Sequence, residues 1–193
     1  ITASSTSVQG LEETLPSGFN GVAFVFGRLA ASVAAEATTL WGEEEHGIHV
    51  VQPKGPSGPT LVLAVGRNLD RRGQVFAAFA ASELILGVEP LYWWTDTEPR
   101  YKGNVSISVT SRTTMPGFVF FASGTPGFRW RGWFTNDEDL LGGFMPDSLG
   151  QSVFSADTWH RIFEALLRLK GNLIIPGTVW FPDEAVGDVA RRR

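Results

Sequence analysis

The spacing of apolar residues predicts both strands and helices in the first part of the chain. Short apolar runs with the length and side-chain types of strands occupy 22–26, 48–52 and 60–65, and the first of them is expected to be a buried strand. Residues 105–109 alternate apolar and polar side chains, as a half-buried strand does. Three prolines and two glycines in 53–59 predict a loop, so the strands on either side of it are predicted to form a hairpin. Residues 28–40 are rich in alanine, and 73–86 carry apolar side chains at helical spacing before Gly87. Both segments predict helices.

A different order of elements is predicted after residue 130. An apolar strand over 130–135 leads directly into the acidic segment Asn136–Asp139. A helix starting at Ser155 is predicted from apolar side chains at helical spacing, namely Trp159, Ile162, Phe163, Leu166 and Leu167. Gly171 is expected to end that helix, and residues 173–176 predict another strand. Strand, helix and strand in this order form a βαβ unit, which requires parallel pairing.

This order of elements predicts two domains. Residues 1–115 are expected to form an α+β domain, and residues 116–193 a partial βαβ segment. The composition is that of a folded protein, because 43% of the 193 residues are hydrophobic and 7 Trp and 14 Phe can fill a core. The 22 Gly and 11 Pro follow no collagen-like period and predict many loops.

Charge and cysteine content exclude several classes of protein. A net charge of −4 provides no basic surface for nucleic acid, and no apolar run approaches the roughly 20 residues that span a bilayer. We therefore expect neither nucleic acid nor a membrane as a partner. Without cysteine there is no disulfide framework and no cysteine-ligated zinc site. Asn104-Val105-Ser106 fits the N-glycosylation pattern and weakly favours secretion, and Ile1 as first residue indicates a processed, cut or engineered chain.

The acidic segment after the strand at 130–135 is the strongest candidate site. Functional side chains of α/β folds gather at the carboxyl ends of parallel strands, where Asp137, Glu138 and Asp139 are predicted to lie. The alternative is a polar turn whose charges are solvated. Neighbouring residues point in different directions, so these three do not by themselves form an acid/base pair.

Four other groups of residues each have a structural alternative. Tyr92-Trp93-Trp94 could stack on sugar rings, or pack in a core or domain interface. Asp70-Arg71-Arg72-Gly73 could bind an anion at a helix start, or be only its charged flank. The acidic run 43–45 is expected to be a solvated turn. His46 and His49 lie near it and could bind a metal, but such closely spaced ligand residues arise mostly by chance, so no metal is expected. His160 lies beside the apolar stripe of its helix and is expected to be structural.

Three blocks of sequence carry a family resemblance when taken together. Residues 61–73 (LVLAVGRNLDRRG) and 81–96 (ASELILGVEPLYWWTD) make up the first block. The second is 131–138 (RGWFTNDE), and the third is 162–172 (IFEALLRLKGN), which Pro176 follows. Their order and spacing resemble glycoside hydrolase family 115, in which the second block begins the catalytic barrel. The resemblance covers roughly Gly47 to Ala185.

The resemblance implies a function and an architecture. It implies an α-glucuronidase that removes glucuronic or 4-O-methylglucuronic acid from xylan without a cofactor. Its α+β domain would precede a TIM barrel, of which residues 116–193 would form the first βαβ unit. Asn136, Asp137, Glu138 and Trp180 are then expected to bind substrate, while the catalytic residues are unknown and the general acid is expected beyond this chain. Ile175 stands where the family usually has Trp, so an aromatic sugar platform is not expected there.

Length limits what the chain is expected to do by itself. From Arg129 onward it is far shorter than the about 250 residues of a TIM barrel. We therefore expect the start of an α-glucuronidase, incomplete as a catalyst alone, that exposes apolar strand surface and associates with another chain or with further copies. One alternative is a non-catalytic module that binds carbohydrate or protein. Another is an unrelated α+β structural protein.

Overall fold

The chain forms two compact units in a computed structural model that describes residues 15–27, 29–30, 38, 40–52, 57–67, 70–100, 118–135, 156–175 and 189–192. The first unit consists of residues 1–88 and 99–127, and the second of residues 89–98 and 128–193. The predicted domain boundary at 115/116 falls in 101–117, outside the described residues. No described helix has the length and apolar character needed to cross a membrane.

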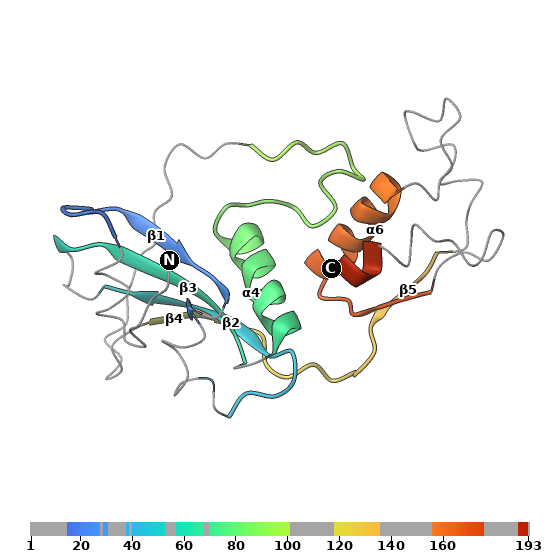
Figure 1. Cartoon of the computed structure of the whole chain (residues 1–193), viewed down its shortest axis with the longest axis horizontal. Helices are drawn as coiled ribbons and strands as arrows, with labels where there is room; N and C mark the ends of the chain where they lie inside the picture. Colours follow the sequence, from blue (N-terminus) through green and yellow to red (C-terminus); the bar gives the residue numbers. More distant parts are fainter. Residues whose placement is uncertain are drawn as a thin grey trace. The chain divides into compact units, whose positions relative to one another are not determined.

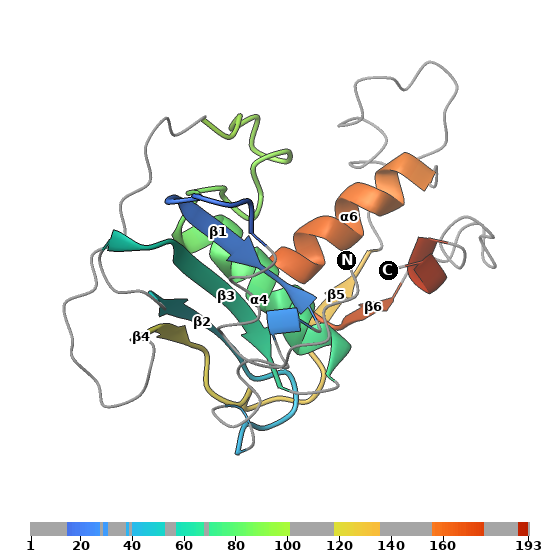
Figure 2. The ribbon, with the colours of Figure 1, turned by 60° about the vertical axis from the view of Figure 1, so that its left-hand side comes forward.

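The first unit is a mixed four-stranded sheet with a helix on one face. Its strands are β1 (Val22–Val25), β2 (His46–Val51), β3 (Thr60–Gly66) and β4 (Phe118–Ala122), in the order β1-β3-β2-β4 (Figures 1 and 2). β1 runs parallel to β3, whereas β2 pairs antiparallel with both β3 and β4. This combination of a mixed sheet and a packed helix confirms the predicted α+β domain and the predicted β2–β3 hairpin.

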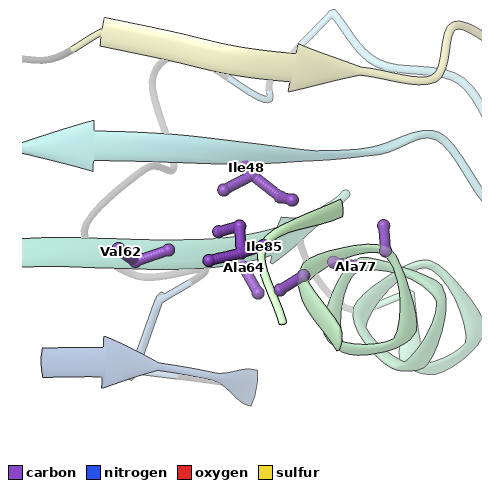
Figure 3. Packing of buried hydrophobic residues seen from close by; sticks show 7 residues of the cluster. Ile48, Val62, Ala64, Ala77 and Ile85 are labelled. Carbon is purple, nitrogen blue, oxygen red and sulfur yellow. The ribbon is translucent and has the colours of Figure 1, made fainter. Parts of the chain in front are cut away.

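The central strand β3 is buried on both faces. Leu61, Leu63 and Val65 pack on one side with Ala30 and Val51. On the other side Val62 and Ala64 contact the helix α4 (Arg71–Leu84), together with Ile48 of β2 (Figure 3). The alternation of side chains along a strand therefore supplies two cores from one apolar run.

α4 begins two residues before the predicted start because Asp70 caps it. The Asp70 carboxylate accepts hydrogen bonds from the N–H groups of Arg72 (3.0 Å) and Gly73 (3.2 Å), which have no partner within the helix. The C-terminal end follows the sequence prediction, with Gly87 in the left-handed region at φ 72°.

The second unit contains the predicted βαβ element. β5 (Gly132–Phe134) and β6 (Leu173–Ile175) pair in parallel and are joined through α6 (Ala156–Arg168). Apolar side chains of α6 form a core with the half-buried Trp94 and Ile174; its fully buried members are Trp159, Ile162, Phe163, Leu166 and, outside the helix, Val189. The predicted parallel pairing is confirmed.

α6 ends in a Schellman motif that has a lysine where glycine is usual. The N–H of Gly171 donates to the carbonyl of Leu166 (2.8 Å), and the N–H of Lys170 donates to that of Leu167 (3.0 Å). Lys170 has φ 62°, a left-handed conformation that costs a side-chain-bearing residue about 1 kcal/mol or more. Gly171 leaves room for Leu166, whose side chain would overlap a Cβ at that position.

Sequence patterns missed or misjudged some elements of the first unit. β1 was predicted as a buried strand, but it lies at a sheet edge and its side chains are half-buried or exposed. The parallel pairing of β1 with β3 was not predicted, nor was β4. Predicted elements at 28–40 and 105–109 fall largely or wholly outside the described residues.

Replacing Lys170 with glycine is expected to raise the free energy of unfolding of the second unit by about 0.5–1 kcal/mol, because glycine adopts the left-handed conformation without a steric penalty. The matched variant Gly171→Ala is expected to lower it by about 1–3 kcal/mol, because its Cβ would overlap Leu166. Urea unfolding followed by the near-ultraviolet circular dichroism of the tryptophans measures the stability of both variants. Two variants as stable as the parent chain would show that this helix end carries neither strain nor a tight contact.

Candidate functional site

The strongest candidate site lies at the carboxyl edge of the β5–β6 pair. The register pairs Gly132 with Leu173, Trp133 with Ile174 and Phe134 with Ile175. The N–H of Thr135 then donates to the carbonyl of Ile175 (2.8 Å), one residue beyond β5. Because the strands are parallel, the chain leaves both of them at the same edge (Figure 2).

The residues predicted to form the pocket follow this edge in sequence. Asn136, Asp137 and Glu138 come directly after Thr135, and Trp180 comes shortly after β6. All four lie outside the described residues, so their assignment to a substrate site stays a prediction. The structure establishes the strand ends from which these two segments start.

One face of the strand pair is apolar and exposed. Ile174 packs under α6, whereas the opposite face presents Phe134, Leu173 and Ile175, whose side chains are 55%, 39% and 48% exposed. A parallel strand pair is normally covered on both faces. The side away from α6 is therefore an uncovered apolar surface.

The two arginines beside β5 do different things. Arg129 places its guanidinium over the ring of the exposed Trp130, at 5.1 Å from the centroid. Arg131 instead donates to main-chain carbonyls, from Nη1 to Phe128 (2.6 Å) and from Nε and Nη2 to Lys170 (3.1 and 3.0 Å). No sequence signal indicated this role of Arg131, because its partner, the carbonyl of Lys170, is distant in sequence.

The aromatic run at 92–94 packs against α6. Trp94 contacts the α6 core, and the guanidinium of Arg161 lies 5.2 Å from the ring centroid of Trp93. Tyr92 has Arg168 over its ring at 5.3 Å, and its hydroxyl donates to the Glu164 carboxylate (3.4 Å). These contacts favour the packing alternative over a sugar-stacking platform, because each of the three side chains is engaged by the helix.

The helix start at Asp70 is built from internal contacts. Besides capping α4, Asp70 accepts a hydrogen bond from the N–H of Glu44 (2.5 Å), which has φ 61°. Glu44 is buried, contrary to the predicted solvated turn, and its carboxylate pairs with Nε of Arg72 (2.6 Å). The charges of this helix start are therefore directed at one another, which favours the structural alternative over an anion site.

The histidines of β2 also lie inside the first unit. His46 is buried; its Nδ1–H donates to the carbonyl of Glu44 (3.0 Å), and its ring lies 5.8 Å from that of Phe76. His49 lies on the opposite face of β2 near Trp41, with ring centroids 5.9 Å apart. Burial lowers the pKa of His49. Within the described part of the chain, no three His, Asp or Glu side chains gather as a metal site would require.

The arrangement of the second unit is that of an α/β protein. Two parallel strands joined by an amphipathic helix are the repeating unit of α/β proteins, whose sites lie at the carboxyl ends of the strands. The family model of glycosyl hydrolase family 115 matches residues 123–191, the segment that contains this unit. The resemblance to this family that the sequence shows is therefore confirmed over this segment.

A solved structure has a similar fold over most of the chain. It is a family 115 4-O-methyl-alpha-glucuronidase with specificity for decorated arabinogalactans. The similarity covers 88% of this chain, with a TM-score of 0.57 and 22% sequence identity. This chain spans 22% of the length of that enzyme. A comparison with curated proteins found no match.

Removing the Asp70 carboxylate tests the structural interpretation of the α4 start. Asp70→Ala is expected to lower the free energy of unfolding of the first unit by about 2 kcal/mol, because the helix cap and the partner of the Glu44 N–H are both lost. Asp70→Asn is expected to lose about half as much, since one oxygen still caps the helix. Chemical denaturation measures both. An Asp70→Ala variant of parental stability would contradict the capping role.

Acidification is expected to destabilise the first unit through His49. Its pKa is lowered by burial in the folded state, so the unfolded chain binds more protons at His49 below about pH 6.5. The contribution of His49 to the free energy of unfolding is therefore fully present above about pH 6.5 and is lost progressively as the pH falls below that value. Denaturant unfolding at pH 7.5 and 5.5 is expected to show a smaller difference for His49→Gln than for the parent chain. An unchanged difference would contradict this assignment.

Proposed function

We propose that this chain supplies the α+β domain and the first βαβ unit of an α-glucuronidase that acts on a uronate-bearing glycan. In this proposal the carboxyl edge of β5–β6 forms one side of the sugar pocket. Asn136, Asp137, Glu138 and Trp180 bind substrate there. The similarity of residues 123–191 to glycosyl hydrolase family 115 supports this proposal.

The parallel register of β5 and β6 is the observation that carries the proposal. It brings Thr135 and Ile175 together at one edge, and the sequence continues from Thr135 into an amide and two carboxylates. Amide and carboxylate groups form hydrogen bonds with the neutral hydroxyls of a sugar. A bound uronate would be repelled by Asp137 and Glu138. Because Arg131 already binds main-chain carbonyls, we propose that the cation facing the uronate comes from elsewhere.

The uncovered apolar face supports a barrel whose remaining strands lie outside this chain. Phe134, Leu173 and Ile175 face away from α6, on the side where a TIM barrel places its interior layers. Glycoside hydrolysis normally uses two carboxyl groups on opposite sides of the scissile bond, and we propose that the general acid is supplied with those strands. The chain alone is then expected to bind sugar without hydrolysing it.

Binding and hydrolysis should be measured together on the 193-residue chain. Glucuronoxylan oligosaccharides and uronate-decorated arabinogalactan oligosaccharides are the two probes, the second chosen for the specificity of the similar solved enzyme. Calorimetric titration is expected to detect binding of at least one probe, and Asp137→Asn to weaken it about tenfold, as loss of a hydrogen bond to an ionised group does. Glu98→Gln, an exposed carboxylate of the second unit, is the matched control and should not change the affinity.

Each result of this experiment decides a separate part of the proposal. No binding of either probe, or equal binding by Asp137→Asn and Glu98→Gln, would contradict a sugar pocket at this edge. Release of free uronic acid that Asp137→Asn abolishes would contradict the need for further strands. Binding of the same glycans without their uronate would instead support a non-catalytic carbohydrate-binding module.

A further inference from the structure

Arg131 joins three parts of the second unit at the amino end of β5. Its guanidinium donates to the carbonyl of Phe128 just before β5 and, through two N–H groups, to the carbonyl of Lys170 at the end of α6. The helix end carries partial negative charge, so a guanidinium is favoured there. The planar guanidinium has several N–H donors in fixed directions and can reach both carbonyls at once, whereas the compact ammonium group of a lysine is less suited to do so.

Asn172 binds the same segment from the β6 side. Its Oδ1 accepts the N–H of Arg131 (2.9 Å), and its Nδ2 donates to the carbonyl of Arg129 (2.7 Å). The carbonyl of Arg131 in turn accepts the N–H groups of Asn172 (2.7 Å) and Leu173 (3.1 Å). The main chain of residues 129–131 is thus held against residues 170–173 by both side chains. We call this set of contacts the Arg131–Asn172 node.

The short strand pair needs such a constraint. β5 and β6 share only three residue pairs in the described structure, so the ladder itself contributes few hydrogen bonds. A slip by one residue would turn Ile174 away from the α6 core and bring Leu173 or Ile175 toward it. It would also shift Thr135 relative to Ile175 at the carboxyl edge. The contacts at the amino end therefore determine which residues meet at the opposite end.

We propose that Arg131, through the Arg131–Asn172 node, is a positioning residue that sets the register of β5 against β6. It thereby sets the relative position of the two segments that leave the carboxyl edge. This inference rests on the proposed function for its role at a sugar site, but the register itself can be measured without any ligand. Arg131 lies at the amino end, so it acts through the strands and not by contact with substrate.

Engineered cysteine pairs report the register, because the natural chain has no cysteine. Phe134→Cys with Ile175→Cys joins direct partners, whereas Phe134→Cys with Leu173→Cys joins positions two residues out of register. Adjacent partners lie within the Cα separation that a disulfide spans, and the offset pair does not. Under a mild oxidant we expect the in-register pair to cross-link about tenfold faster in the parent background.

Each pair is then measured with Arg131→Ala, Arg131→Lys and the control Arg129→Ala, whose guanidinium lies over Trp130 and outside the node. We expect the rate ratio to fall toward 1 in Arg131→Ala, to be intermediate in Arg131→Lys, and to be unchanged in Arg129→Ala. Far-ultraviolet circular dichroism reports whether α6 remains folded. Millimolar guanidinium added to Arg131→Gly is expected to restore the ratio.

The outcomes separate this inference from the proposed function. A tenfold ratio that persists in a folded Arg131→Ala variant would overturn the positioning role. So would loss of α6 in every Arg131 variant without recovery by guanidinium, because the residue would then act on folding alone. A ratio that depends on Arg131 in a chain that binds no uronate glycan would support the node and contradict the proposed function.

Discussion

Parallel pairing of β5 with β6 is the constraint on which the rest of the second unit depends. Parallel strands cannot be joined by a tight turn, so the chain must cross over through α6. The apolar stripe of that helix then has to be buried, which the Ile174 side of the strand pair and the aromatic segment 89–98 together achieve. The same pairing leaves an apolar face on the side opposite the helix. It also places the carboxyl ends of both strands at the same edge.

The two edges of the strand pair are therefore chemically different. At the amino edge, the polar groups of Arg131 and Asn172 are directed at the main chain of this unit and hold it together. The carboxyl edge leads instead into Asn136, Asp137 and Glu138 in the sequence. A division in which one edge maintains the fold and the other carries the chemistry is what barrel enzymes show.

Periodicity predicted the elements that bury a single apolar face. It did not predict the roles of residues whose partners lie far away in the sequence. The stripe of α6 and the β2–β3 hairpin were visible because their apolar spacing reflects local burial. Glu44 was predicted to lie in a solvated turn, yet it is buried and pairs with Arg72. The contact between its N–H group and Asp70 joins residues too far apart in sequence for a pattern to reveal. The roles of Tyr92-Trp93-Trp94 and of Arg131 likewise required knowing where α6 lies. The four predicted sugar-binding residues could be named from sequence, but their arrangement could not be derived from it.

Mapping of amide chemical shifts tests most directly whether the carboxyl edge binds a uronate sugar. An isotopically labelled chain would be titrated with an aldouronic oligosaccharide bearing 4-O-methylglucuronic acid. We predict that the changes concentrate at Thr135, Ile175 and residues 136–138, with little change at the amino edge. Changes that centre on the exposed Trp130, or on the first unit, would contradict a site at the carboxyl edge.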